Sequence, residues 1–235
     1  MTESPVPPRQ LIFPLPHEAG ATRADFLTGP SNEAAVALID AWPDWPERGV
    51  LLAGPVGSGK SHLAVIWQRL AGATLVRAGD LTEAAVAEVN GPVTVEDLHA
   101  GPVDERALFH LLNRAYERRL AVLITSRAWP AALRLNLPDL ISRLRAMQPV
   151  ELGEPDDDLL KRVLAKLFAD RQLAVDRTVI DYAAVRMERS LAAAGALVER
   201  LDREALAAGR PITRGLAGIV MAEMFDNQPD FWPEE

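Results

Sequence analysis

The chain has 235 residues, of which 49% are hydrophobic and 25% are charged, and its formal net charge at pH 7 is −8. This composition is that of an ordinary globular protein, with room for one large domain or for a core domain and a small one. The acidic balance argues against nucleic-acid binding through the overall charge, although a local basic patch stays open. The absence of cysteine excludes disulfides and thiolate metal sites. Without an apolar run of about 20 residues or a signal-peptide pattern, we expect a cytoplasmic protein with no membrane span.

Residues 1–22 form a proline-rich N-terminal arm, with prolines at positions 5, 7, 8, 14 and 16. Proline disfavours helices and central strands, so we predict an extended arm. It contains an apolar segment whose candidate contact residues are Gln10, Leu11, Phe13 and Leu15. Such a segment can fill a groove on a partner or fold back onto its own domain, and the composition leaves both open.

Residues 54–61 read GPVGSGKS and match the P-loop pattern. An apolar run precedes them and an apolar helical pattern follows, which is the strand–loop–helix context that this motif needs. The glycines let backbone N–H groups curl around phosphate oxygens, and the following helix points its positive end at the same anion. We therefore predict that Lys60 reaches the phosphates of ATP or ADP and that Ser61 ligates Mg²⁺.

Two further strand ends carry polar residues. The apolar run at 92–98 ends in Glu96 and Asp97, the arrangement of a Walker B strand. Glu96 is the candidate metal partner, and Asp97 is the candidate base that orients water. The run at 120–126 ends in Thr125 and Ser126, where a polar sensor of the γ-phosphate would lie; an ordinary strand-end turn is the alternative.

The element pattern predicts an α/β core followed by helices alone. Strands are expected near residues 50–53, 74–77, 93–96, 121–125 and 149–151, separated by helices, which favours a five-stranded parallel sheet covered on both faces. After residue 152 we expect only a small bundle, with helices at 156–170, 178–185 and 190–208 and a short last helix opening near 210. Ser31 or Asn32 is the expected cap of a helix at 33–40.

Two arginines beyond these motifs have the chemistry to contact phosphate. Arg143 lies near the end of a predicted helix at 139–145, where it either complements the helix dipole or reaches a phosphate in another subunit. Arg189 precedes the third helix of the bundle, and spacing alone favours a solvated surface arginine there.

The order of these motifs resembles the AAA+ family, within it the DnaA branch, and most of all the DnaA-related regulators of the Hda type, including their alphaproteobacterial form. The resemblance covers roughly residues 8–220 and depends most on residues 137–144 and 187–191. It implies a P-loop AAA+ core over residues 23–152 and an all-α lid over 153–235. It also implies a nucleotide-binding set of Asp25, Phe26, Pro55, Gly57, Ser58, Gly59, Lys60, Ser61, His62, Ser126 and Arg189, with Arg143 as an arginine finger acting in trans.

The resemblance further implies a function and two partners. The arm at 10–15 is similar to the sliding-clamp-binding motif of Hda-type proteins, and the implied activity is to promote hydrolysis of ATP bound to DnaA. Two departures matter. Glu96 stands where DnaA has an aspartate, so we expect slow self-hydrolysis. Only about 15 residues, acidic on balance, follow the last predicted helix, where DnaA has a basic helix-turn-helix domain. We therefore expect little direct DNA binding.

Two other functions stay open at this stage. An autonomous ATPase, such as a helicase loader of the DnaC or IstB type, would turn over ATP alone and bind a helicase. A nucleotide-free adaptor is the second, and the intact loop at 54–61 argues against it. The residues do not decide between ADP and ATP as the working ligand, and a homodimer formed through the arm also stays open.

Overall fold

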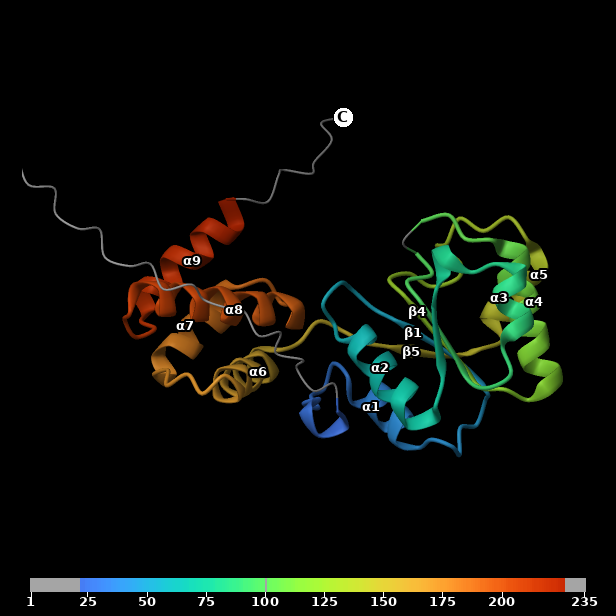
Figure 1. The fold of residues 1–235 in the computed structure, drawn as a ribbon, viewed down its shortest axis with the longest axis horizontal. Coiled ribbons are helices and arrows are strands. Elements are labelled where there is room, and N and C mark those ends of the chain that lie inside the picture. The colour runs from blue at the N-terminus through green and yellow to red at the C-terminus, as the bar shows by residue number, and fades with distance from the viewer. Residues whose placement is uncertain (1–21, 100, 227–235) are drawn as a thin grey trace, which may run out of the picture.

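The computed structural model describes residues 22–99 and 101–226 (Figure 1). The predicted clamp-binding residues Gln10, Leu11, Phe13 and Leu15 lie outside this part of the chain. Within it, an α/β core and a helical lid lie side by side along the long axis of the molecule, joined by the segment that follows the last strand. None of the described helices is both long and apolar enough to cross a bilayer.

The core is built on a five-stranded sheet, as predicted. Its strands are β1 (Gly49–Ala53), β2 (Thr74–Arg77), β3 (Val93–Glu96), β4 (Val122–Ser126) and β5 (Gln148–Glu151). Their order is β2-β3-β4-β1-β5, and every neighbouring pair is parallel. The strand that leads into the P-loop therefore lies inside the sheet, with Leu52 level with Thr125 on one side and Val150 on the other.

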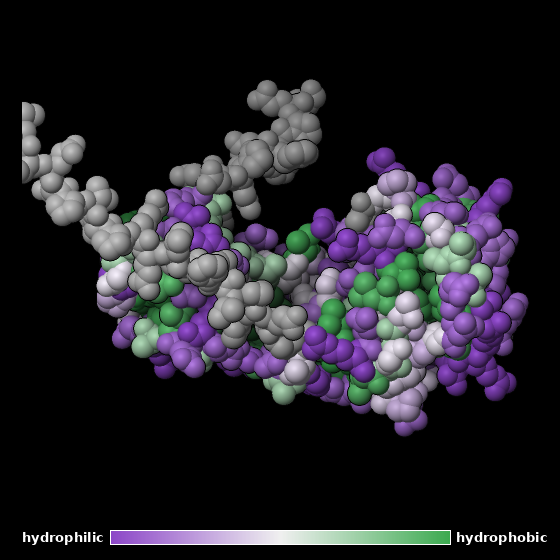
Figure 2. Space-filling view, viewed as in Figure 1, coloured by the Kyte–Doolittle hydropathy of each residue, from purple (hydrophilic) through white to green (hydrophobic). Residues whose placement is uncertain are grey.

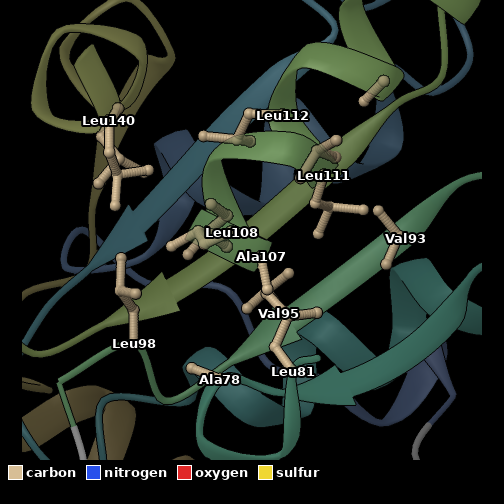
Figure 3. Close-up of a cluster of buried hydrophobic side chains, with 14 of the residues drawn as sticks. Ala78, Leu81, Val93, Val95, Leu98, Ala107, Leu108, Leu111, Leu112 and Leu140 are labelled. Carbon is tan, nitrogen blue, oxygen red and sulfur yellow. The ribbon is translucent and has the colours of Figure 1, made fainter. Parts of the chain in front are cut away.

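Helices cover both faces of the sheet, because its central strands are apolar on both sides. On one face α3 (Glu83–Glu88), α4 (Glu105–Arg118) and α5 (Pro138–Arg145) enclose a core that includes Leu108, Leu111 and Leu140 (Figure 3). On the other face α1 (Glu33–Asp40) and α2 (Lys60–Ala71) enclose a second core. Short 3-10 turns lie at Arg23–Asp25 and Ala78–Asp80.

A tryptophan cluster fixes the P-loop helix against the second core. Trp67 of α2 is fully buried and stacks on Trp45, with ring centroids 4.9 Å apart. Trp42 meets both rings edge to face. Because aromatic side chains bury large apolar areas, this contact holds the direction in which α2 leaves the P-loop.

The lid has its own hydrophobic core, formed by α6 (Asp157–Asp170), α7 (Arg177–Arg186), α8 (Leu191–Ala208) and α9 (Arg214–Asp226). The side chains of Asp156, Asp176 and Ser190 accept hydrogen bonds from the first turns of α6, α7 and α8, and so cap these three helices. The last helix is 13 residues long, so the prediction of a short one was wrong.

The expected cap of α1 at Ser31 or Asn32 is confirmed in its position but not in its hydrogen bonding. Asn32 is the N-cap residue of α1, but its side chain makes no capping hydrogen bond. Its Oδ1 instead accepts from the Gly29 N–H at 2.9 Å, and its Nδ2 donates to the Leu27 carbonyl at 3.1 Å. The buried amide therefore braces the preceding loop, because that loop needs both a donor and an acceptor there.

Candidate functional site

The P-loop leaves the carboxyl end of β1 in a conformation that glycine makes accessible. The Gly54 N–H donates to the Ser126 carbonyl at 3.3 Å, which ties the start of the loop to the end of β4. Gly57 and Gly59 have φ angles of 72° and 101°, in the left-handed region where other residues are strained. Lys60 then begins α2, so the first turn of the helix faces the space that the loop encloses.

Lys60 is drawn into the loop and is only 7% exposed. Its Nζ donates to the carbonyl oxygens of Gly54 at 2.8 Å and Pro55 at 2.7 Å. Burial lowers the pKa of Lys60, the nearby charge of Arg127 lowers it further, and Asp97 opposes the shift. The ammonium group is thus partly desolvated and bonded to neutral acceptors, an environment in which a phosphate is a stronger partner.

Ser61 and Glu96 lie within hydrogen-bonding reach of each other, across the gap between α2 and β3. The Ser61 hydroxyl donates to the Glu96 carboxylate, and burial raises the pKa of Glu96. The other oxygen, Oε1, is buried and has no hydrogen-bond partner among the described residues. Two oxygen ligands with spare acceptor capacity at this point fit Mg²⁺, which usually takes one or two protein oxygens together with phosphate and water.

Asp97 is held beside them by β4. It has a φ angle of 59°, a left-handed conformation, and its N–H donates to Thr125 Oγ1 at 3.1 Å. Ser126 is fully buried, and its Oγ accepts from the Ala128 N–H at 3.2 Å. The two hydroxyls at the end of β4 thus support the loops after β3 and β4, and the predicted phosphate-sensing role of Ser126 stays a prediction.

Arg127 is a candidate functional residue that the sequence motifs did not indicate. It follows the end of β4, is exposed, and its N–H donates to His99 Nδ1 at 3.0 Å. Its charge contributes to lowering the pKa values of Lys60 and His99, after burial in both cases, so the guanidinium lies near the P-loop. The available signal was an arginine directly after the Thr125–Ser126 strand end.

A cavity of about 370 Å³ lies between the core and the lid, where Asp25, Phe26 and His62 meet α6 and α8. The rings of Phe26 and His62 pack edge to face, with centroids 5.2 Å apart. Burial lowers the pKa of His62, and its Nε2 has no hydrogen-bond partner among the described residues. The Asp25 carboxylate pairs with Lys166 of the lid at 2.9 Å. The cavity thus combines an aromatic wall with polar groups beside the P-loop helix.

The lid contacts the P-loop directly. The Leu191 N–H at the start of α8 donates to the Gly57 carbonyl at 2.8 Å. A Cβ atom at Gly57 would lie 1.8 Å from Ser190 Oγ, so only glycine fits under the lid. Arg189 directly precedes Ser190, but its guanidinium pairs with Asp157 at 2.6 Å, and both side chains are half-exposed. The structure therefore places Arg189 next to the P-loop contact and directs its charge to a carboxylate.

Arg143 lies apart from all these residues. It lines a cavity of about 640 Å³ together with Gly49 and Val122, the first residues of β1 and β4. The P-loop follows the last residue of β1, so Arg143 is at the opposite, amino edge of the sheet, roughly 13 Å away along a five-residue strand. Its guanidinium carbon lies over the Tyr116 ring, 5.0 Å from the ring centroid. The predicted site therefore forms at the carboxyl edge, except for Arg143.

The fold is that of AAA+ P-loop ATPases. It is similar to domain III of the replication initiation protein DnaA from Thermotoga maritima, with a TM-score of 0.77 and 18% identity over 89% of this chain and 98% of that one. AMPPCP-bound DnaA from Aquifex aeolicus has a TM-score of 0.69 and 18% identity over 88% and 70% of the two chains. The RuvB branch migration motor of T. maritima has a TM-score of 0.66 and 18% identity over 83% and 69%. No family model matches this chain.

Proposed function

We propose that this chain is a cytoplasmic, adenine-nucleotide-binding regulator of replication initiation. The residues of the carboxyl edge fit ADP or ATP with Mg²⁺: Lys60 and the loop N–H groups would hold phosphates, and Ser61 and Glu96 would hold the metal ion. The bound cation would supply positive charge against the phosphate oxygens. The DnaA structure from A. aeolicus, which has this fold, contains AMPPCP.

The lid and the cavity beside it support the same assignment. Phe26 and His62 offer an aromatic wall for a base, and the cavity of about 370 Å³ is of the size that small-molecule sites take. Because α8 is hydrogen-bonded to Gly57, a ligand in the P-loop would also contact the start of the lid. We therefore propose that the nucleotide sets the position of the lid on the core.

The observation that carries the regulatory proposal is the position of Arg143. It is exposed at the amino edge of the sheet, and no carboxylate of the described residues pairs with it. A permanently charged guanidinium at this place is remote from the chain's own P-loop and available to a phosphate on another molecule. We propose that Arg143 completes the ATP site of DnaA and promotes hydrolysis there, as an Hda-type regulator.

The sliding clamp is the second proposed partner. The proposal rests on the apolar sequence at 10–15, which lies outside the described residues. A pull-down with purified clamp should recover the wild-type chain, while Leu11→Ala and Phe13→Ala should each reduce recovery, because both remove apolar area from the docking segment. Recovery of both variants at the wild-type level would exclude this segment as the clamp contact.

The direct test of the regulatory proposal is hydrolysis of DnaA-bound ATP in the presence of DNA-loaded clamp. Arg143→Ala should remove most of the stimulation, since an arginine finger in other nucleotide hydrolases is worth roughly 10³- to 10⁵-fold in rate. Arg145→Ala is the matched control, because it removes an exposed arginine from the same last turn of α5. Equal stimulation by wild type and Arg143→Ala would refute the finger assignment.

An autonomous ATPase is the alternative function, and one observation favours it. Lys60, Ser61, Glu96 and Asp97, the residues predicted to bind and hydrolyse ATP, all lie at the carboxyl edge of this chain's own sheet. The purified chain alone would then turn over ATP at rates typical of ATPases, and Asp97→Asn would abolish that turnover. Slow turnover that Asp97→Asn leaves unchanged would favour the regulatory function.

A further inference from the structure

Tyr116 is an exposed aromatic residue next to Arg143. It lies in the last turn of α4, is 74% exposed, and belongs to neither hydrophobic cluster of the core. The guanidinium carbon of Arg143 lies over its ring, 5.0 Å from the centroid. An exposed tyrosine that adds nothing to the core and carries an arginine on its face needs a reason outside folding stability.

The geometry of this pair differs from that of the arginines that form ion pairs with carboxylates. Arg189, Arg162 and Arg203 each donate an N–H to a carboxylate. A ring face attracts the guanidinium charge without binding its N–H donors as a carboxylate does. Stacking therefore restrains Arg143 without introducing an anion that would compete with a phosphate.

Another tyrosine offers a comparison within the same chain. Tyr182 also carries arginines, with Arg186 at 4.2 Å and Arg214 at 5.0 Å from its ring. Tyr182, however, is half-buried and packs against the lid core, so its stacking accompanies a structural role. Tyr116 belongs to neither core cluster, and the end of the core that carries α4 and α5 is largely hydrophilic in Figure 2.

We infer that Tyr116 is a positioning residue for Arg143: its ring holds the guanidinium in one orientation, with the donors directed outward, before a partner arrives. The inference rests on the proposed function and deepens it by naming the group that orients the finger. A stacked cation at an exposed site is worth roughly a two- to fivefold change in population. Its loss should therefore lower the rate at which a bound partner's ATP is hydrolysed, and should not alter partner binding.

The experiment uses the full chain with DnaA–ATP and DNA-loaded clamp, titrated to saturation. Tyr116→Ala should lower the maximal stimulated rate roughly two- to fivefold and leave the half-saturating concentration unchanged. Tyr116→Phe keeps the ring and should restore the wild-type rate. Arg143→Ala, measured in parallel, reports on the proposed function itself.

A second readout needs no partner. In the free protein, the Arg143 Nε–H signal in a ¹H–¹⁵N spectrum, assigned from its loss in Arg143→Ala, should carry a ring-current shift. That shift should persist in Tyr116→Phe and vanish in Tyr116→Ala. Its absence in the wild type would overturn the inference.

The outcomes are separable. If Arg143→Ala loses stimulation while Tyr116→Ala keeps the full rate, the inference alone fails. If Tyr116→Ala raises the half-saturating concentration and spares the maximal rate, Tyr116 contacts the partner and the positioning role is excluded. If Arg143→Ala stimulates as well as wild type, both the proposed function and the inference fall.

Discussion

The two edges of the sheet present opposite kinds of site. At the carboxyl edge, Lys60 and Ser126 are buried, the P-loop is bonded to the lid, and hydrogen bonds join the ends of β1, β3 and β4. At the amino edge, Arg143 is exposed and its guanidinium lies over the ring of Tyr116, which is also exposed. The groups of the first edge contact one another within the chain, whereas under the proposed function the second edge offers a group to another molecule.

The difference has a physical basis. Parallel strands bring their carboxyl ends, and the loops that follow, to one edge, where converging backbone and side-chain groups can be shielded together. The amino edge receives the ends of helices, so a side chain there keeps its hydration until a partner covers it. Changes at the carboxyl edge should therefore alter folding and nucleotide binding together, and changes at the amino edge should alter only what the chain does to a partner.

Gly57→Ala is expected to have the largest effect, because it changes the contact between the P-loop and the lid at the carboxyl edge. The new Cβ would lie 1.8 Å from Ser190 Oγ and 2.8 Å from Ser190 Cβ, on a residue with φ of +72°. The free energy of unfolding should fall by roughly 2–5 kcal/mol, measured by denaturant titration. Gly72→Ala is the control, because Gly72 has φ of +63° with nothing within 4 Å, so it adds backbone strain alone. Equal losses in the two variants would mean that the lid does not press on the P-loop.

Lys60→Ala should change the carboxyl edge and leave the amino edge as in the wild type. It removes the buried ammonium group from the P-loop, so nucleotide affinity measured by calorimetry should fall roughly 10- to 100-fold. Arg143 and Tyr116 are remote from the change, so the ring-current shift of the Arg143 Nε–H signal should stay as in the wild type. A change in that ring-current shift would show that the two edges are coupled and would contradict this prediction.

Asp157→Asn should strengthen nucleotide binding at the carboxyl edge. Asp157 holds the guanidinium of Arg189 at 2.6 Å in an exposed pair. Release of Arg189 toward the P-loop should raise ATP affinity by roughly two- to fivefold, the range for exposed ion pairs, and ADP affinity by less. Arg189→Ala in the same background should cancel the gain. Unchanged affinity in Asp157→Asn would indicate that Arg189 does not act on the nucleotide.

The smallest effect concerns Asp25, which links the core to the lid. The pKa of Asp25 is lowered by a hydrogen bond from Thr22 and then by Lys166, so its ionised form is favoured in the folded chain. Its contribution to stability is therefore present above the ordinary pKa of 3.8 and is lost as the pH falls through the lowered value. The melting temperature of Asp25→Asn should lie slightly below that of wild type at pH 7, and the gap should close in acid and shrink in high salt. A gap that widened in acid would contradict this sign.

Much of the fold was predictable, because its signals are local. The strand and helix positions follow from apolar runs and caps, and the P-loop places Lys60 and Ser61 through eight consecutive residues. The features that the sequence did not predict depend on contacts between residues far apart in the chain, or on side chains that choose a different hydrogen-bond partner. The Asn32 side chain braces a loop that the pattern had not distinguished from a helix start, and Arg127 carries no motif of its own.

The sequence by itself determined the parallel sheet, the phosphate-binding loop and the acidic strand end, since each depends on residue types at fixed short spacing. Only the tertiary structure decided that Ser61 bonds to Glu96, that Ser190 covers Gly57, that Asp157 holds Arg189 and that Tyr116 lies under Arg143. These pairs are separated by between 27 and 133 residues along the chain, so chain folding rather than spacing brings them together. The same folding places Arg143 on the edge opposite the P-loop, which is why its proposed target is another molecule's nucleotide.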